Sequence, residues 1–271
     1  MVLALGKASG LNEGPVHLFA VALALLSLAV PAKAEPEAAP PVLPGIGAHD
    51  PRVRASPEAG PWRAVGKLQA TTGGLHESCT GTLIGPATVL TAAHCVFNLR
   101  TRHNFLPESL HFLIGYNGDD YDGHAVGVRL VTGPGYDPLH PWKTLGSDWA
   151  LLTISSRLGT PDRVLALRDE PPSVGTIVMI GGYSQDHPLV LMIDPKCRIT
   201  KRAADSAARP LLVDDCGATR GVSGAPVLVQ DGKSWGVGGI YVAAVAKAQG
   251  GIVVPLVDVR AYLERKAGSQ E

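Results

Sequence analysis

The sequence GATRGVSGAP (Gly217–Pro226) contains a serine between two glycines, with a proline shortly after it. Glycine permits backbone conformations that a Cβ atom would forbid, so a tight turn can form here and present the Ser223 hydroxyl outward. Such a turn can aim the N–H groups of Gly221 and Ser223 at one point and form an oxyanion hole. Alone, the pattern GxSGxP is a weak signal, because small glycine–serine turns are common.

Two upstream stretches strengthen this interpretation: TAAHC (residues 91–95) and SDWALL (residues 147–152). A serine becomes a good nucleophile when an imidazole takes its proton, and a carboxylate fixes the tautomer of that imidazole. The chain offers base, orienting acid and nucleophile in the order His94, Asp148, Ser223. This order differs from those of the subtilisins and the α/β-hydrolases.

TAAHC, SDWALL and GVSGAP resemble the three catalytic blocks of trypsin/chymotrypsin-like serine peptidases, in particular the secreted bacterial branch that includes the glutamyl endopeptidases. The resemblance covers roughly residues 45–265. It implies an all-β fold of two six-stranded Greek-key barrels, with the active site in the cleft between them and a C-terminal helix packed on the second barrel. It also implies peptide-bond hydrolysis through an acyl-enzyme, with His94 as base, Asp148 as orienting acid, Ser223 as nucleophile, and the N–H groups of Gly221 and Ser223 as oxyanion hole.

Length and composition are compatible with this reading. The chain has 271 residues, 45% of them hydrophobic, which suffices for one large all-β domain or two small ones. Its 24 basic and 24 acidic side chains balance, so charge gives no reason to expect nucleic acid or an anionic membrane as a partner. We expect a mixed, solvated surface, a monomer acting on a protein or peptide substrate, and no cofactor.

Residues 1–34 are predicted to be a signal peptide. An apolar run of thirteen residues (18–30) is followed by Ala32-Lys33-Ala34, a small-x-small cleavage pattern. The run is shorter than the roughly 20 residues that a membrane span needs, so no stable membrane insertion is expected after cleavage. An uncleaved signal anchor is the alternative. The predicted location is therefore secreted or periplasmic.

The remaining chain divides by composition and by strand signals. Residues 35–60, rich in proline, alanine and glycine, are predicted to be a tail or propeptide, although residues 45–53 resemble the segment that bacterial relatives carry before their first strand. Short strands separated by turns then predict an N-terminal barrel over 61–160 and a C-terminal barrel over 161–254. Within residues 255–271, one apolar stripe at i, i+3 and i+7 predicts a helix followed by a tail: Leu256, Val259 and Leu263.

Four cysteines allow three pairings, and export makes disulfides favourable. The family resemblance pairs Cys79 with Cys95 beside the catalytic histidine, which leaves Cys197 with Cys216. A zinc site is the competing use, but no Cys-x-x-Cys pair is present, so no metal is expected there. The carboxylates of Asp119–Asp122 could bind calcium, but their positions do not match an EF-hand, and a solvated turn is preferred.

Substrate specificity is less well indicated. Trypsin-type pockets carry an aspartate six residues before the serine, where this chain has Gly217. Glutamate-specific relatives present a histidine on one pocket wall, where this chain has Tyr241. Neither basic nor glutamate preference is therefore supported, and a modest apolar pocket is predicted. Its expected lining is Gly217, Ala218, Tyr241, Val242 and Ala243.

Activation by a newly created N-terminus is not supported, because Val222 precedes the serine where relatives activated in this way carry an acid.

Two further functions remain open. A catalytically silent or latent protease-fold binding protein is one alternative, opposed by the intact triad residues and Gly221. An esterase using the same triad is the other, opposed by the barrel-family order of the three residues.

Overall fold

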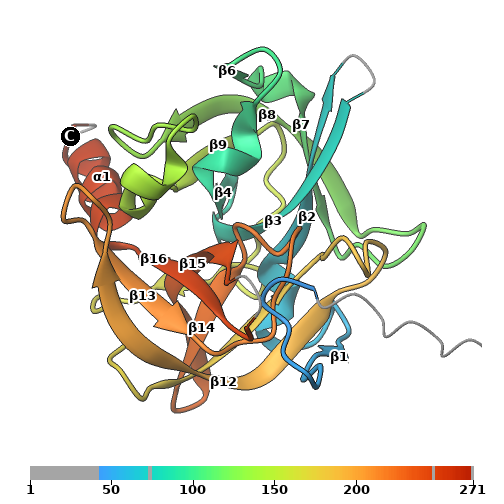
Figure 1. The fold of residues 1–271 in the computed structure, drawn as a ribbon. Coiled ribbons are helices and arrows are strands. Elements are labelled where there is room, and N and C mark those ends of the chain that lie inside the picture. The colour runs from blue at the N-terminus through green and yellow to red at the C-terminus, as the bar shows by residue number, and fades with distance from the viewer. Residues whose placement is uncertain (1–42, 73–74, 246–247, 270–271) are drawn as a thin grey trace, which may run out of the picture. The chain divides into compact units, whose positions relative to one another are not determined.

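A computed structural model describes residues 43–72, 75–245 and 248–269. The predicted signal peptide (1–34) and the first part of the predicted tail lie outside these residues. Within these described residues nearly all regular structure is β-strand, and the one α-helix among them, α1 (Val257–Gly268), is at the C-terminal end (Figure 1). Among the described residues, no helix is both long and apolar enough to cross a membrane.

The strands form two closed antiparallel barrels of six strands each, as the family resemblance implied. The first contains β2 (Val65–Thr72), β3 (Leu75–Gly85), β4 (Thr88–Thr91), β7 (Leu110–Ile114), β8 (Gly123–Thr132) and β9 (Ala150–Ile154). The second contains β11 (Ile177–Gly182), β12 (Met192–Ala204), β13 (Pro210–Asp214), β14 (Pro226–Asp231), β15 (Ser234–Ala244) and β16 (Gly251–Pro255).

Both barrels share one topology. If the six strands of a barrel are counted along the chain, their order around the barrel is first, second, third, sixth, fifth, fourth. The fourth strand then pairs with the first and closes the barrel. This is the Greek-key arrangement repeated twice. Alternating apolar residues fill each interior, and β9 is almost entirely buried. Gly66 leaves room for the Phe112 ring, because a Cβ atom there would lie 2.5 Å from Phe112 Cζ.

Short elements connect these strands. They are the strands β1 (Val53–Arg54), β5 (Phe97–Asn98), β6 (His103–Asn104) and β10 (Ala166–Leu167), and the 3₁₀ turns η1 (Gly60–Ala64), η2 (Ala93–Val96), η3 (Pro107–Ser109), η4 (Pro141–Lys143) and η5 (Leu145–Ser147). β10 lies within residues 157–172, a polar, proline-bounded stretch that the sequence predicts to connect the two barrels, and it pairs in parallel with β15.

Three details differ from the sequence-based expectations. Strand signals in the sequence predict two separate strands, over residues 189–193 and 196–201, but β12 runs unbroken through Pro195. The β11–β12 register shifts next to this proline, and proline, which has no N–H to donate, is tolerated at such a bulge. The helix α1, expected on the second barrel, contacts the first barrel: Tyr262 packs near Trp149 and accepts a hydrogen bond from Arg129.

The third difference concerns the predicted tail. We call residues 43–54 the N-terminal arm. Its strand β1 pairs with β12, and Gly45 N donates to the Val245 carbonyl over 2.9 Å, so the arm is built onto the second barrel (Figure 1). Ile46 and Arg52 are buried. Proline and glycine do not prevent this docking, because the arm uses the barrel's strands as its hydrogen-bond partners.

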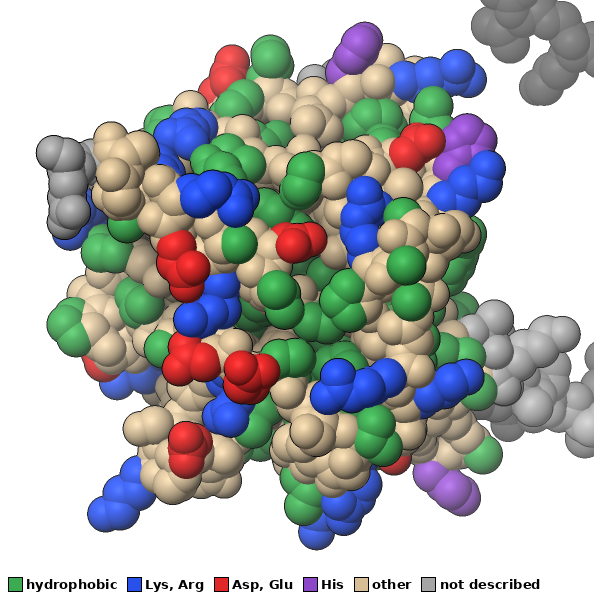
Figure 2. All heavy atoms as spheres, turned by 90° about the vertical axis from the view of Figure 1, so that its left-hand side faces the viewer, with side chains coloured by type: hydrophobic (Ala, Val, Ile, Leu, Met, Phe, Trp, Pro, Cys, Tyr) green, Lys and Arg blue, Asp and Glu red, His purple; other side chains and the backbone are tan. Residues whose placement is uncertain are grey.

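The surface carries charges of both signs. On the face drawn in Figure 2, basic and acidic side chains are interspersed with apolar ones. Within the Asp119–Asp122 turn, Asp122 forms an ion pair with Arg163 at 2.6 Å, while Asp119 and Asp120 are exposed.

Candidate active site

The predicted base and its orienting acid are brought together by the first barrel. His94 lies in η2, directly after β4, and Asp148 lies between η5 and β9. β4 and β9 are hydrogen-bonded neighbours, with Thr91 opposite Ala150, so the residues that follow one strand lie beside those that precede the other. His94 Nδ1 is 2.7 Å from Asp148 Oδ2, and His94 N donates to Asp148 Oδ1 over 2.8 Å.

This pairing assigns the tautomer. A carboxylate only accepts hydrogen bonds, so Nδ1 of His94 carries the proton and Nε2 is left as the basic nitrogen. Asp148 is 1% exposed, whereas the His94 side chain is 34% exposed and is therefore accessible from solvent. Burial by itself lowers the pKa of His94, but attraction to Asp148, the hydrogen bond with it and the Glu77 carboxylate outweigh burial and raise the pKa above its ordinary value.

The predicted nucleophile comes from the second barrel. Ser223 lies in the turn before β14, and its carbonyl accepts a hydrogen bond from Thr80 N of the first barrel over 2.9 Å. Ser223, His94 and Asp148 line one cleft with a volume of about 820 Å³. The Cys79–Cys95 disulfide, which lines the same cleft, ties β3 to η2 next to His94.

The two backbone donors predicted for the oxyanion hole are free of protein acceptors. Within the part of the chain that the structure describes, neither Gly221 N–H nor Ser223 N–H donates a hydrogen bond, although the intervening Val222 N–H does. Gly221 has φ 91°, a left-handed conformation that favours glycine, and a Cβ atom there would lie 2.5 Å from the Tyr183 carbonyl oxygen. Both N–H groups are thus unpaired among the described residues.

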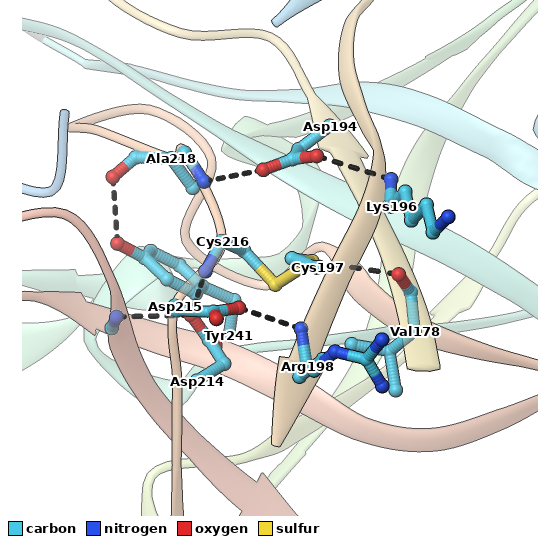
Figure 3. The surroundings of a disulfide bond; sticks show 12 residues. Val178, Asp194, Lys196, Cys197, Arg198, Asp214, Asp215, Cys216, Ala218 and Tyr241 are labelled. Atoms are coloured by element: carbon cyan, nitrogen blue, oxygen red, sulfur yellow. Dashed lines mark hydrogen bonds between the residues drawn. A yellow bond between two sulfur atoms is a disulfide. The ribbon is translucent and has the colours of Figure 1, made fainter. Parts of the chain in front are cut away.

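The predicted pocket residues divide into two groups. Val242 and Ala243 line the cleft, whereas Gly217, Ala218 and Tyr241 do not. Tyr241 is 1% exposed, and its hydroxyl donates to the Ala218 carbonyl over 2.8 Å (Figure 3). The Tyr241 ring is thus buried beside Ala218 and does not line the cleft.

Two buried carboxylates, Asp194 and Asp214, lie in the surroundings of the Cys197–Cys216 disulfide (Figure 3). Asp194 accepts from Gly217 N, and Asp214 accepts from Cys216 N and Gly251 N (Figure 3). Burial raises the pKa of Asp214 to about 7, against smaller lowering by the two backbone donors. The Cys197–Cys216 disulfide ties Cys216, two residues after Asp214, to β12, which carries Asp194 and Cys197. Both disulfides therefore form the pairs that the family resemblance implied.

Sequence reasoning missed much of the cleft's surroundings. Thr80 is fully buried, and its hydroxyl donates to the Gly221 carbonyl and accepts from Tyr183 N. Glu77 lines the cleft close enough to affect His94 electrostatically. Exposed apolar side chains flank the opening at Leu99 and Trp142. No motif marks these residues, because their roles depend on contacts between distant parts of the chain.

Metal binding finds little support beside His94. Cys79, His94 and Cys95 are the described group whose potential ligand atoms lie within 4.8 Å of one another. The two sulfur atoms are bonded to each other, so neither is a thiolate that could bind a metal.

Two antiparallel six-stranded barrels that contribute His, Asp and Ser to one cleft define the class of double-barrel serine hydrolases. The Trypsin family model matches residues 52–261, and this chain belongs to that family. The predicted family resemblance is confirmed.

Individual relatives point to one branch. The chain is 29% identical over 159 residues to a glutamyl endopeptidase of Bacillus licheniformis; the match covers 57% of this chain and 46% of that protein, about half the length of the relative. A solved structure of a Glu endopeptidase in complex with MPD has a TM-score of 0.66 and 22% identity, and covers 82% of this chain and 99% of that one. The structural likeness supports the fold.

Proposed function

We propose that this protein is an exported serine endopeptidase that cleaves protein or peptide substrates through an acyl-enzyme. The observation that carries the proposal is the bonded His94–Asp148 pair in one cleft with Ser223. His94 Nε2 removes the Ser223 proton as the oxygen attacks the peptide carbonyl, then protonates the leaving amine. Asp148 stabilises the imidazolium that forms between these two steps.

The oxyanion of the tetrahedral intermediate is assigned to the N–H groups of Gly221 and Ser223. Each donor of this kind contributes on the order of 3 kcal/mol to the transition state. Water then attacks the acyl-enzyme with His94 again acting as base, which releases the second product. No step requires a metal or an organic cofactor. Two disulfides support a chain that matures in an oxidising compartment, secreted or periplasmic.

The structure of the pocket supports a small, uncharged residue before the scissile bond. In this proposal the buried Tyr241 ring occupies the base of the pocket, and its hydroxyl donates a hydrogen bond to the Ala218 carbonyl. Neither space nor a free donor therefore remains there for a glutamate side chain. This proposal departs from the glutamate preference in the names of the relatives. The esterase and the silent binding protein remain the competing functions.

A fluorophosphonate probe tests the proposed nucleophile. The folded, oxidised protein should form one adduct, located at Ser223 by mass spectrometry, and Ser223→Ala should abolish it. Ser78→Ala is the matched control, because Ser78 lines the same cleft but has no assigned role. Labelling elsewhere, or none in folded protein, would reject the triad and favour the binding protein.

Turnover separates the two hydrolase activities. A denatured protein substrate should be cut at internal peptide bonds, and mass spectrometry of the fragments gives the residue before each cut. Matched ester and amide substrates of one peptide distinguish the esterase, which would hydrolyse the ester and leave the amide intact. Ser223→Ala should lower kcat by about 10⁶.

A further inference from the structure

Arg52 of the N-terminal arm is a buried cation with two carboxylate partners. Its side chain is 2% exposed, and its guanidinium lies 2.7 Å from Asp50 Oδ2 and 2.6 Å from Asp186 Oδ2. A third contact runs from Nη1 to Ser184 Oγ at 3.3 Å. Because an unpaired buried charge is costly, Arg52 and Asp186 hold each other in place. The arm is thereby fixed to residues 183–187, the segment that follows β11.

This segment contacts the turn that carries the predicted oxyanion hole. Gln185, between the two Arg52 partners, donates its N–H to the Arg220 carbonyl over 2.8 Å. In a trans peptide the C=O and the following N–H point in opposite directions. Holding the Arg220 carbonyl toward Gln185 therefore turns the Gly221 N–H away from Gln185. That N–H has no acceptor among the described residues, as a working oxyanion donor requires before substrate binds.

We propose that Arg52 is a positioning residue that holds the Arg220–Gly221 peptide in the orientation needed for an oxyanion hole. The inference rests on the proposed function, because it gives the Gly221 N–H a catalytic task. Its chain of contacts is Arg52 to Asp186 and Ser184, then Gln185 N to the Arg220 carbonyl.

The residue before the serine explains why such a device is needed. Val222 is apolar and 2% exposed, so it offers no carboxylate to an activating N-terminal amine. The N-terminal arm supplies the Arg52 guanidinium instead, which pairs with Asp186. The turn that carries Gly221 is then held without a newly created N-terminus. A maturation cut in the predicted tail must then fall before Arg52 to keep the ion pair with Asp186, and before Asp50 to keep both ion pairs.

Arg52→Met in the full chain tests the proposal, because methionine keeps an apolar stem of similar reach and removes the charge. Arg54→Met is the matched control: Arg54 is another arginine of the N-terminal arm, two residues further on in β1, but it is exposed and contacts Asn117. Losing one oxyanion donor costs about 10²- to 10³-fold in kcat, so loosening its peptide should cost roughly 10- to 100-fold. KM should change less than about threefold, and Arg52→Lys should restore part of the rate.

A tetrahedral inhibitor provides a readout that a merely structural role would not move. A peptidyl aldehyde forms an oxyanion on Ser223, so its Ki should rise in parallel with the loss of kcat, while the affinity for a product peptide stays unchanged. Equal losses in Arg52→Met and Arg54→Met, or kcat within threefold of wild type in folded Arg52→Met, would overturn the proposal.

Amide exchange keeps the inference independent of turnover. The Gln185 N–H should exchange at least about tenfold faster in Arg52→Met than in Arg54→Met, because its carbonyl partner is no longer held. Equal exchange would reject the contact chain even if the enzyme is active. Absent turnover and absent Ser223 labelling in the wild type would reject the proposed function, while faster exchange would still support the contact chain.

Discussion

The hydroxyl of Tyr241 donates a 2.8 Å hydrogen bond to the Ala218 carbonyl and thereby joins the two predicted walls of the substrate pocket. The ring lies against Gly251, where a Cβ atom would come within 2.0 Å of Tyr241 Cε2. Burial and the carboxyl of Asp214 raise the pKa of Tyr241, which keeps the hydroxyl neutral and able to donate. Under the proposed function, this tyrosine shortens the pocket and makes it unsuited to an anionic side chain.

Replacing Tyr241 should change the residue accepted before the scissile bond. In Tyr241→Val the ring is lost. The ratio of kcat/KM for peptides with leucine or methionine before the scissile bond to kcat/KM for peptides with alanine there should therefore rise by about 10- to 100-fold. A peptide library digested by each protein and read by mass spectrometry gives these ratios. Tyr241→Phe keeps the ring and should retain the small-residue preference. An efficient cut after glutamate by the wild type would contradict the shortened pocket.

The pH dependence of activity should report Glu77. His94 must be neutral to act as base, so kcat/KM rises with pH through the pKa of His94 in the free enzyme. The Glu77 carboxylate contributes to raising that pKa. Glu77→Gln should therefore move the acid limb to lower pH and leave the plateau rate unchanged.

A pH–rate profile of kcat/KM between pH 4 and 9 checks this shift. Glu108→Gln is the control, because Glu108 is an exposed carboxylate of the same barrel in η3. An acid limb that stays in place in Glu77→Gln, or moves to higher pH, would show that Glu77 does not act on His94.

The sequence was sufficient to predict the fold and the family, both of which are confirmed, and the same motifs predict the triad residues. TAAHC, SDWALL and GVSGAP are local signals, and the strand order that brings His94 beside Asp148 follows from the family to which they point. The strand signals on either side of Pro195 predict two strands. Only the register shift in the pairing with β11, where β12 carries one extra residue, shows why Pro195 is tolerated within a single strand.

The arm and the pocket base could not be predicted in the same way. Arg52 looks like any surface arginine in a proline-rich stretch, and its burial depends on Asp186, which lies 134 positions away in the sequence. Tyr241 lies on β15, but its burial and its contacts with the Ala218 carbonyl and Gly251 follow from the fold of the second barrel and not from any local motif. Such long-range contacts leave no periodic pattern in the sequence.

The two disulfides should differ in what they protect. Cys79–Cys95 closes a loop of 16 residues and Cys197–Cys216 a loop of 19, so each disulfide contributes roughly 3 kcal/mol to the free energy of unfolding. Cys79–Cys95 also fixes η2 beside the cleft, so the double variant Cys79→Ser/Cys95→Ser should lose about tenfold or more in kcat through misplacement of His94.

Removing Cys197–Cys216 by two serine substitutions should lower the melting temperature comparably while leaving kcat within about threefold, because that bridge does not line the cleft. Both variants are assayed well below their own melting temperatures. Equal losses of kcat would show that the first disulfide has no special connection with the base.

Asp214 should make the protein less stable as pH rises. Burial raises its pKa to about 7 in the folded protein from an ordinary 3.8. Between these values the folded state holds a proton that the unfolded state has released, so the free energy of unfolding falls as pH increases through this window. From pH 5 to 8 the expected loss is roughly 3 kcal/mol. Asp214→Asn keeps the Oδ1 acceptor for Cys216 N and Gly251 N but does not titrate, so it should not suffer this loss.

Urea unfolding at pH 5 and pH 8 measures the difference directly. The drop in unfolding free energy should be smaller in Asp214→Asn than in wild type by about the stated amount, and the variant should be the more stable protein at pH 8. Asp231→Asn is the control, since the Asp231 side chain is 84% exposed and should leave the wild-type pH dependence intact. If Asp214→Asn instead shows the same unfolding free energies as wild type at both pH values, Asp214 is ionised in the folded protein. Asp214 would then place a full negative charge next to Tyr241 at neutral pH. That charge would repel glutamate from the pocket more strongly still, so either result bears on specificity as well as on stability.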